Sequence, residues 1–304
     1  MAITAVAHSG EETPPPPPAA GSSRRRRVVL FLLLPGLAWL IVFFLVPIFT
    51  LFGTSLQVPV PGGDIGEFQP AVHIGTYAEA IVDYQEQFLR AFGYAATATL
   101  LALVISYPLA YVIAFRAGRW RNLLLVLVIA PFFTSFVLRT VAWRQILSDD
   151  GFVVSTLRNL HLIGATTTVT ASSVAVIAGI TYNFLPFMTL PLYASLERID
   201  PRLIEAGADL YGNGPAVLRR VTFPLSMPGV VAGTLLTFIP AAGDYVNAAL
   251  LGNSRTQMVG NVVESRFFRI VDYPTAAALS FILMAIILLL VFFYIRRAGT
   301  EELV

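Results

Sequence analysis

The sequence contains no cysteine, and all 20 of its basic residues are arginine, so lysine is absent as well. Without cysteine the chain can form no disulfide and offers no thiolate as a metal ligand or nucleophile. Without lysine it cannot carry the phosphate-binding lysine of a P-loop, which excludes the usual machinery for ATP hydrolysis. If ATP drives this protein, we expect the ATPase to be a separate subunit.

Charge is also scarce. Only 12% of the 304 residues are charged, whereas 56% are hydrophobic. A soluble domain of this size needs far more charge on its surface, so the composition predicts an all-α, polytopic membrane protein. The three histidines (His8, His73 and His161) fall in the N-terminal tail and in loops, without the spacing of a metal site or a catalytic triad. We therefore argue against an enzyme.

Six apolar segments each have the roughly 20 residues that a hydrocarbon core of about 30 Å requires. They span residues 28–52, 92–115, 122–143, 171–196, 229–251 and 275–295. The sequence thus predicts a six-helix transmembrane domain over residues 28–297. Residues 1–27, which include the proline run 14–18, are expected to form a disordered tail, and residues 298–304 a short second tail.

The arginines are distributed unevenly between the two sides of this predicted topology. Thirteen of the 20 fall in the N-terminal tail, the loop after the second span, the interlude after the fourth span and the C-terminus, whereas five fall in the alternate loops. Positively charged loops stay in the cytoplasm. The distribution therefore predicts that both termini and the interlude are cytoplasmic.

The interlude itself, residues 200–227, is polar and too short to span a bilayer. Asp200 followed by Pro201 is typical of a helix start, because the carboxylate can cap free N–H groups and proline suits the first helical position. Gly212, Asn213 and Gly214 indicate a turn, and Pro224 closes a second short helix. On pattern alone this is either a helix-turn-helix docking element or an ordinary connecting loop.

The interlude resembles the EAA loop of permease subunits of bacterial ABC importers. Glu205, Ala206 and Pro224 match the pattern of that loop at the right spacing. Gly207 replaces its second alanine, and Tyr211 occupies its glycine position, with Gly212 one place later. The resemblance implies a protein of the bacterial inner membrane with a coupling helix that docks onto an ATPase. The residues expected to take part are Glu205, Ala206, Gly207, Asp209, Tyr211, Gly212, Gly214, Arg219, Arg220 and Pro224.

Three further stretches, residues 131–147, 182–200 and 243–252, are similar to the first permease subunit of spermidine/putrescine importers. This resemblance implies one of two different permeases that share a translocation path for a small cationic solute, a polyamine. It also implies an ABC ATPase dimer, which holds the ATP and Mg²⁺, and a periplasmic or lipoprotein solute-binding protein. We expect no cofactor in this chain itself and no nucleic-acid partner.

Asp244 is the most informative polar residue inside a span. It follows Pro240 and Gly243, so the fifth helix is expected to be kinked or broken there. A carboxylate within a span costs about 2.5–3.5 kcal/mol and usually faces a cavity or a partner. It either pairs with Arg139, at a similar depth in the third span, or meets a cationic substrate. The candidate residues of the substrate path are Asp244, Tyr245, Asn247, Arg139, Trp143, Tyr182 and Asn183.

Two other classes of protein remain as alternatives. A self-contained secondary transporter would normally show inverted repeats, more spans and several ionisable groups within the membrane. A membrane-anchored scaffold would use the interlude as a generic interaction site. Six spans with essentially one buried acid favour the importer over both.

Overall fold

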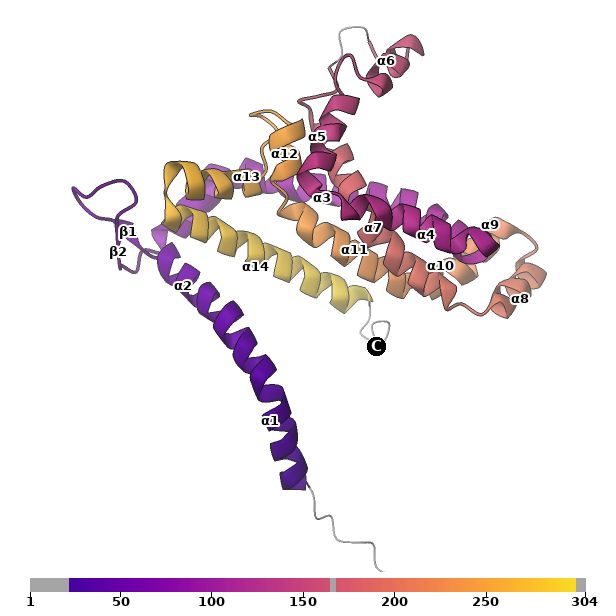
Figure 1. Ribbon diagram of the computed structural model, residues 1–304, viewed down its shortest axis with the longest axis horizontal. Coiled ribbons are helices and arrows are strands. Elements are labelled where there is room, and N and C mark those ends of the chain that lie inside the picture. Colours follow the sequence, from indigo (N-terminus) through magenta and orange to yellow (C-terminus); the bar gives the residue numbers. More distant parts are fainter. Residues whose placement is uncertain (1–21, 165–167, 299–304) are drawn as a thin grey trace, which may run out of the picture. The chain divides into compact units, whose positions relative to one another are not determined.

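The structure is a computed structural model in which residues 22–164 and 168–298 are described, and the described part of the chain is almost entirely helical (Figure 1). Contacts divide the chain into two units, residues 1–51 and 52–304, which are taken separately below. The predicted tails lie largely outside the described residues. The first helix nevertheless begins at Ser22, inside the tail expected over residues 1–27.

The first unit is a single apolar helical segment. It comprises α1 (Ser22–Leu40), the π-helical turn η1 (Ile41–Leu45) and the beginning of α2 (Val46–Ser55). The π-turn comes just before Pro47, which has no amide hydrogen to donate to the carbonyl of Phe43, so a wider turn accommodates the missing bond. The stretch Phe31–Ser55 is long and apolar enough to cross a membrane, close to the predicted first span.

The second unit opens with a small antiparallel hairpin, β1 (Val58–Pro59) and β2 (Phe68–Gln69). The hairpin is followed by α3 (Gly75–Phe115), a helix of 41 residues that is kinked at Tyr84. The predicted second span, residues 92–115, is therefore only the C-terminal part of a longer helix. The amphipathic segment that precedes it in the sequence continues the same helix, because no proline or glycine breaks the backbone between them.

The third predicted span, residues 122–143, is not one straight helix. The segment Gly118–Phe133 and the helix α5 (Phe136–Ile146) meet at an angle of 98°. Thr134 and Ser135 are extended, with ψ of 156° and 133°, so no helix can continue through them. The sequence alone does not predict this break, because Pro131 is its only local signal.

The remaining helices follow in chain order. Their bounds are η2 (Gly118–Trp120), α4 (Arg121–Ile129), η3 (Ala130–Phe133), α6 (Phe152–Asn159), α7 (Ser173–Glu197), α8 (Pro201–Tyr211), α9 (Gly214–Val217), η4 (Leu218–Thr222), α10 (Phe223–Leu225), α11 (Met227–Ala242), α12 (Val246–Leu251), α13 (Val259–Glu264), η5 (Ser265–Ile270) and α14 (Tyr273–Ala298). The fifth predicted span, residues 229–251, is divided in two, because α11 ends at Ala242.

Four helices in the described residues are long and apolar enough to cross a membrane, and two bent pairs bring the number to six if each pair counts as one span. The second bent pair joins Gly214–Leu225 to Met227–Ala242 at 68°. The architecture is thus the all-α, polytopic membrane fold that the composition predicts.

The core forms where α3, α7 and α11 pack along one another (Figure 1). Small residues on α3, such as Ala91, Ala95 and Ala98, are fully buried, so the helix backbones approach closely. On α11 the glycines of a G-x-x-x-G pattern face α7. A Cβ added at Gly229 would lie 2.5 Å from Ser195 Cβ, and one at Gly233 would lie 2.8 Å from Met188 Sδ.

A candidate coupling element and a polar break in the membrane domain

The coupling element, defined here as α8 to α10 (residues 201–225), is a helix-turn-helix with capped ends. Asp200 Oδ1 accepts a hydrogen bond from Arg202 N at 2.9 Å and so caps α8, with Pro201 in the first turn. At the other end Gly212 adopts φ of +68°, a left-handed conformation that favours glycine. Asn213 Oδ1 then accepts from Ala216 N at 2.9 Å to begin α9. These contacts agree with the predicted caps and turn, whereas the second helical segment does not end at Pro224 but continues to Leu225.

The two departures from the EAA pattern are explained by contacts inside the element. Gly207 is buried where α8 crosses the next helices, and a Cβ added there would lie 3.0 Å from Val221 Cγ2. The methyl group of an alanine at position 207 would crowd this crossing. The Tyr211 ring lies under the Arg220 guanidinium, with 4.8 Å between Arg220 Cζ and the ring centroid. The positive-φ turn falls on Gly212, one residue after the family's glycine position.

An apolar stripe on α8 is exposed. Leu203, Ala206 and Leu210 are spaced three and four residues apart and are all exposed, with Leu203 at 49% and Leu210 at 74%. Glu205 and Asp209 are exposed beside them, whereas Ile204 packs against the core. Only part of the apolar surface of α8 is therefore buried. The remaining residues of the candidate set, Gly214, Arg219 and Pro224, are exposed.

The base of the coupling element is joined to α3. Tyr107 OH lies 2.9 Å from Ser226 Oγ, and the rings of Tyr107 and Phe223 have centroids 5.6 Å apart. These two contacts place the base of the coupling element against the longest helix of the described residues.

The second candidate site is the break between α11 and α12. Gly243, Asp244 and Tyr245 separate the two helices, as the sequence predicts. Asp244 is only 7% exposed. Its Oδ1 accepts from Asn247 N at 3.0 Å, and its Oδ2 accepts from Asn247 Nδ2. Asp244 thus begins α12 in the manner of a capping residue.

Buried polar side chains link this break to two other helices. Asn183 Nδ2 on α7 donates to Asn247 Oδ1 at 3.0 Å and to Thr140 Oγ1 on α5 at 3.2 Å. Thr140 Oγ1 also lies 3.4 Å from Asn247 Oδ1. Sequence reasoning brought Asp244, Asn183 and Asn247 together but missed Thr140, because a threonine within a span usually bonds only to its own helix.

Arg139 does not pair with Asp244 in this conformation, since no ion pair formed by the described residues joins the two. Arg139 Nη1 instead donates to Pro131 O, and its guanidinium carbon lies 5.8 Å from the ring centroids of Phe132 and Phe136. Arg139 therefore bridges the 98° bend and satisfies a carbonyl at the end of the first segment.

The aromatic candidates form two separate groups. Trp143 and Tyr182 are in contact, with ring centroids 5.2 Å apart. Tyr182 lines a cavity of about 250 Å³ together with Arg139 and Asn183. Within it Asn183 Oδ1 and Arg139 Nε have no hydrogen-bond partner in the described part of the chain.

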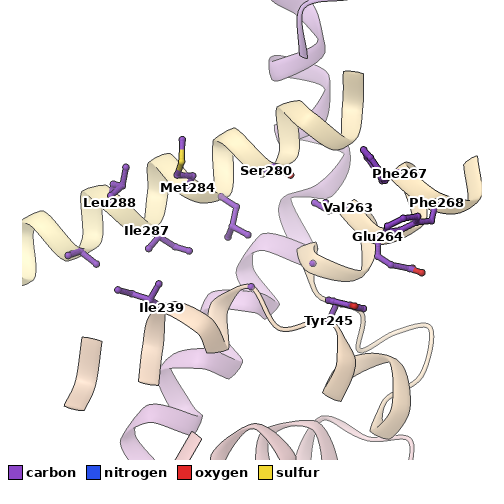
Figure 2. A pocket seen from close by; sticks show the side chains of 14 residues that line it. Ile239, Tyr245, Val263, Glu264, Phe267, Phe268, Ser280, Met284, Ile287 and Leu288 are labelled. Atoms are coloured by element: carbon purple, nitrogen blue, oxygen red, sulfur yellow. The ribbon is translucent and has the colours of Figure 1, made fainter. Parts of the chain in front are cut away.

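Tyr245 belongs to a different hollow. It lines an apolar pocket of about 560 Å³ between the break, α13, η5 and α14, with Phe267 and Phe268 nearby and the Glu264 carboxylate on its wall (Figure 2). Glu264 was not anticipated from the sequence, which contains no pattern that brings it near the break. Among the described residues, no cluster of histidine and acidic side chains could hold a metal ion.

The second unit is a helical membrane domain with an exposed helix-turn-helix and a polar break, and these features define a polytopic membrane protein. The family of binding-protein-dependent transport system inner membrane components matches residues 106–298. The chain belongs to this family. It is a permease subunit of an ABC importer of the inner membrane, rather than a secondary transporter, a scaffold or an enzyme.

Curated relatives agree with this assignment. The chain is 34% identical over 260 residues to the spermidine/putrescine transport system permease protein PotB of Haemophilus influenzae, covering 85% of this chain and 90% of the relative. It is 34% identical to PotB of Escherichia coli K12, covering 86% and 94%. It is 31% identical to the inner membrane ABC transporter permease protein YdcU of Escherichia coli K12, covering 70% and 72%.

Solved structures share the fold. A bacterial ABC transporter involved in the import of the acidic polysaccharide alginate superposes with a TM-score of 0.67 at 19% identity, over 90% of this chain and 96% of that one. The same kind of transporter in complex with an alginate pentasaccharide-bound periplasmic protein gives a TM-score of 0.65 at 18% identity, over 92% and 96%.

Proposed function

We propose that this permease imports a polyamine, and that Asp244 recognises an ammonium group of the substrate. The supporting observation is a carboxylate, 7% exposed, that forms none of the ion pairs found among the described residues. A charge buried in a spanning segment is costly unless it is paired, so a cationic cargo would supply the missing partner. The 34% identity to spermidine/putrescine permeases points to the same substrate.

The remaining candidates have complementary roles in this proposal. The rings of Tyr245, Trp143 and Tyr182 offer π-faces to an alkylammonium chain. Asn183 and Asn247 carry the amides around Asp244. Arg139 carries a positive charge and repels a cation, so we assign it to the edge of the path, where it would keep the chain of the substrate on the Asp244 side.

We further propose that α8 inserts into a groove on one subunit of a separate ABC ATPase dimer, which binds ATP and Mg²⁺. The exposed stripe of Leu203, Ala206 and Leu210 has the spacing of helix-in-groove recognition. Glu205 and Asp209 would contact basic groups on the ATPase, and Arg219 would add a peripheral contact. In this proposal ATP-driven closure of the ATPase moves the coupling element and, through Tyr107, the bundle.

The complete importer would also contain a second, different permease and a periplasmic or lipoprotein solute-binding protein. Both termini of this chain would be cytoplasmic, in line with its arginine distribution. These partners are proposed from the family and from the exposed surfaces described above.

Replacing Asp244 with Asn tests the substrate. We expect Asp244→Asn to abolish spermidine-stimulated ATP hydrolysis by the reconstituted importer while the complex still assembles, because the amide is nearly isosteric and removes only the charge. Asp150→Asn, at an exposed position, is the matched control and should behave as wild type. Undiminished stimulation in Asp244→Asn would rule out the ammonium contact.

A different small solute is the second candidate, favoured by Arg139. The cavity of about 250 Å³ pairs its guanidinium with the unpartnered amide oxygen of Asn183, an arrangement suited to an anionic or polar group. A binding screen on the partner solute-binding protein separates the two candidates, since binding of an anion in place of spermidine or putrescine would favour this one.

A further inference from the structure

We infer that Asn247 is a latch that occupies Asp244 in this conformation, and that Thr140 and Asn183 are positioning residues that hold the latch closed. The inference rests on the proposed function, in which Asp244 meets an ammonium group. It adds that Asn247 controls access to the Asp244 carboxylate. Asn183 and Asn247 then do not only line the path but also regulate whether substrate reaches Asp244.

The first step is the occupancy of the carboxylate. Asn247 bonds to both oxygens of Asp244, because Asn247 N donates to Oδ1 at 3.0 Å and Asn247 Nδ2 donates to Oδ2. Asp244 is 7% exposed and Asn247 is fully buried. A substrate ammonium must therefore compete with the Asn247 amide for Oδ2 in a site that is almost closed to solvent.

The second step is the orientation of that amide. A carboxamide has an acceptor on one side and donors on the other. With Asn247 Nδ2 on Asp244, the oxygen Oδ1 faces Asn183 Nδ2 at 3.0 Å and the Thr140 hydroxyl at 3.4 Å. The Thr140 hydroxyl also lies 3.0 Å from Phe136 O on its own helix, so Asn183 makes the stronger contact with the Asn247 oxygen. Turning the amide over would bring two NH₂ groups together and place an oxygen against a carboxylate. Asn183 and Thr140 thus select the orientation that covers Asp244.

The third step is that the latch joins helices that can move apart. Thr140 is on α5, just beyond the 98° bend, and Asn247 is on α12, just beyond the Gly243–Tyr245 break, whereas Asn183 is within α7. Helices that follow breaks can pivot on them. A pivot of either one removes a partner from the Asn247 oxygen, and the amide is then free to leave Asp244.

The backbone of the break is held independently of the latch. Asn261 Nδ2 on α13 donates to Tyr245 O at 2.8 Å, and a Cβ added at Gly260 would lie 2.7 Å from Gly243 O. Opening the latch therefore exposes the carboxylate without unravelling the segment that carries it.

The test is chemical access to Asp244 in the assembled importer, with its partner subunits, in lipid nanodiscs. A hydrophobic carbodiimide modifies carboxyl groups inside membranes, and peptide mass spectrometry locates the adduct. We expect Thr140→Val to raise the rate of labelling at Asp244 roughly fivefold, the effect of losing one buried hydrogen bond. Asn183→Leu should do the same.

Two controls make the result specific. Thr237→Val is the matched change, because Thr237 is also fully buried but its hydroxyl has no hydrogen-bond partner in the described residues. It should leave labelling at the wild-type rate. Thr140→Ser keeps the hydroxyl and should restore the wild-type rate. If Thr140→Val and Asn183→Leu both label as slowly as Thr237→Val in intact complexes, the latch is disproved.

Labelling needs neither substrate nor ATP, so it can succeed when the polyamine assignment fails. In the Thr140→Val importer, spermidine should protect Asp244 from the carbodiimide, in support of the ammonium contact. Rapid labelling without protection would support the latch and overturn the proposed substrate.

Discussion

At the residue scale, the turn of the coupling element depends on one backbone conformation. Gly212 has φ of +68°, and nothing lies within 4 Å of the place where its Cβ would be. Any cost of a side chain there is therefore conformational and not steric crowding by neighbours. Gly214, two residues later, is equally open and has no positive φ, so the two glycines form a natural comparison.

We predict that Gly212→Ala loosens this turn. A left-handed conformation costs a residue with a Cβ about 1–2 kcal/mol. Limited proteolysis within residues 200–227 should accelerate roughly fivefold or more, because cleavage follows the population of the opened state. Gly214→Ala should be cleaved at the wild-type rate, and equal acceleration in both variants would contradict the explanation.

At the element scale, α8 presents an apolar stripe that its own protein does not cover. Burying one leucine side chain contributes about 1.5–3 kcal/mol. A helix that leaves Leu210 at 74% exposure is therefore poised to gain from docking.

Leu210→Glu should weaken binding of the ATPase at least tenfold, about 1.4 kcal/mol, while the permease remains folded. Titration of the purified ATPase onto the permease measures the change. Leu160→Glu, at a leucine that is 62% exposed after α6, should bind the ATPase normally. An unchanged affinity in Leu210→Glu would remove α8 from the interface.

The crossing of α7 and α11 requires a residue without a side chain at Gly229. A Cβ at Gly229 would lie 2.7 Å from Pro191 O as well as against Ser195. Gly229→Val should destabilise the protein by about 1–3 kcal/mol through overpacking, seen as a lower thermal unfolding midpoint in detergent. Gly93→Val, in an open position on α3, is the control, and a comparable loss there would point to β-branching and not to the crossing.

The elements also show how far the sequence could be interpreted. The caps at Asp200 and Asn213, the turn at Gly212 and the break before Asp244 follow from local chemistry, which the sequence carries directly. The 98° bend at Thr134 and Ser135 and the contact of Thr140 with Asn183 do not, because they depend on packing between residues more than 40 positions apart. The glycine at position 207 could not be explained from the sequence either, because the residue that leaves no room for a side chain there is Val221, across the turn.

At the scale of the whole molecule, the distribution of arginine predicts which face of the membrane each loop occupies. The chain contains no cysteine, so single cysteines can be introduced without removing any. Asp209→Cys reports on the coupling element, and Asn159→Cys reports on the end of α6. Both positions are exposed.

We predict that a membrane-impermeant maleimide applied to spheroplasts labels Asn159→Cys at once, and labels Asp209→Cys only after the membrane is permeabilised. The reason is that 13 of the 20 arginines lie on the side assigned to the cytoplasm. The reverse pattern would invert the orientation and place the coupling element out of reach of any cytoplasmic ATPase.

Helix α3 connects two distant parts of the permease. Near one end Tyr107 holds the base of the coupling element. At the kink, 23 residues earlier, Tyr84 OH accepts from Arg266 Nε at 3.0 Å, and Arg266 Nη1 also binds Asp272 at 3.0 Å. Burial opposes the charge on Arg266, but its bonds to Tyr84 and Asp272 raise the pKa of the guanidinium above its usual value.

Arg266 therefore stays charged at any physiological pH. Its bonds connect Tyr84, at the kink of α3, to Asp272, at the turn that begins α14. At about 1.5 Å per residue, the helix between Tyr84 and Tyr107 is roughly 35 Å long. We expect this stretch to move as one body, without a series of small side-chain rearrangements along it. If the coupling element is displaced, we therefore expect the displacement to reach the kink of α3 at Tyr84. The bending stiffness of one helix, and not a pathway of side-chain contacts, would then determine how closely the movement at Tyr84 follows the movement of the coupling element.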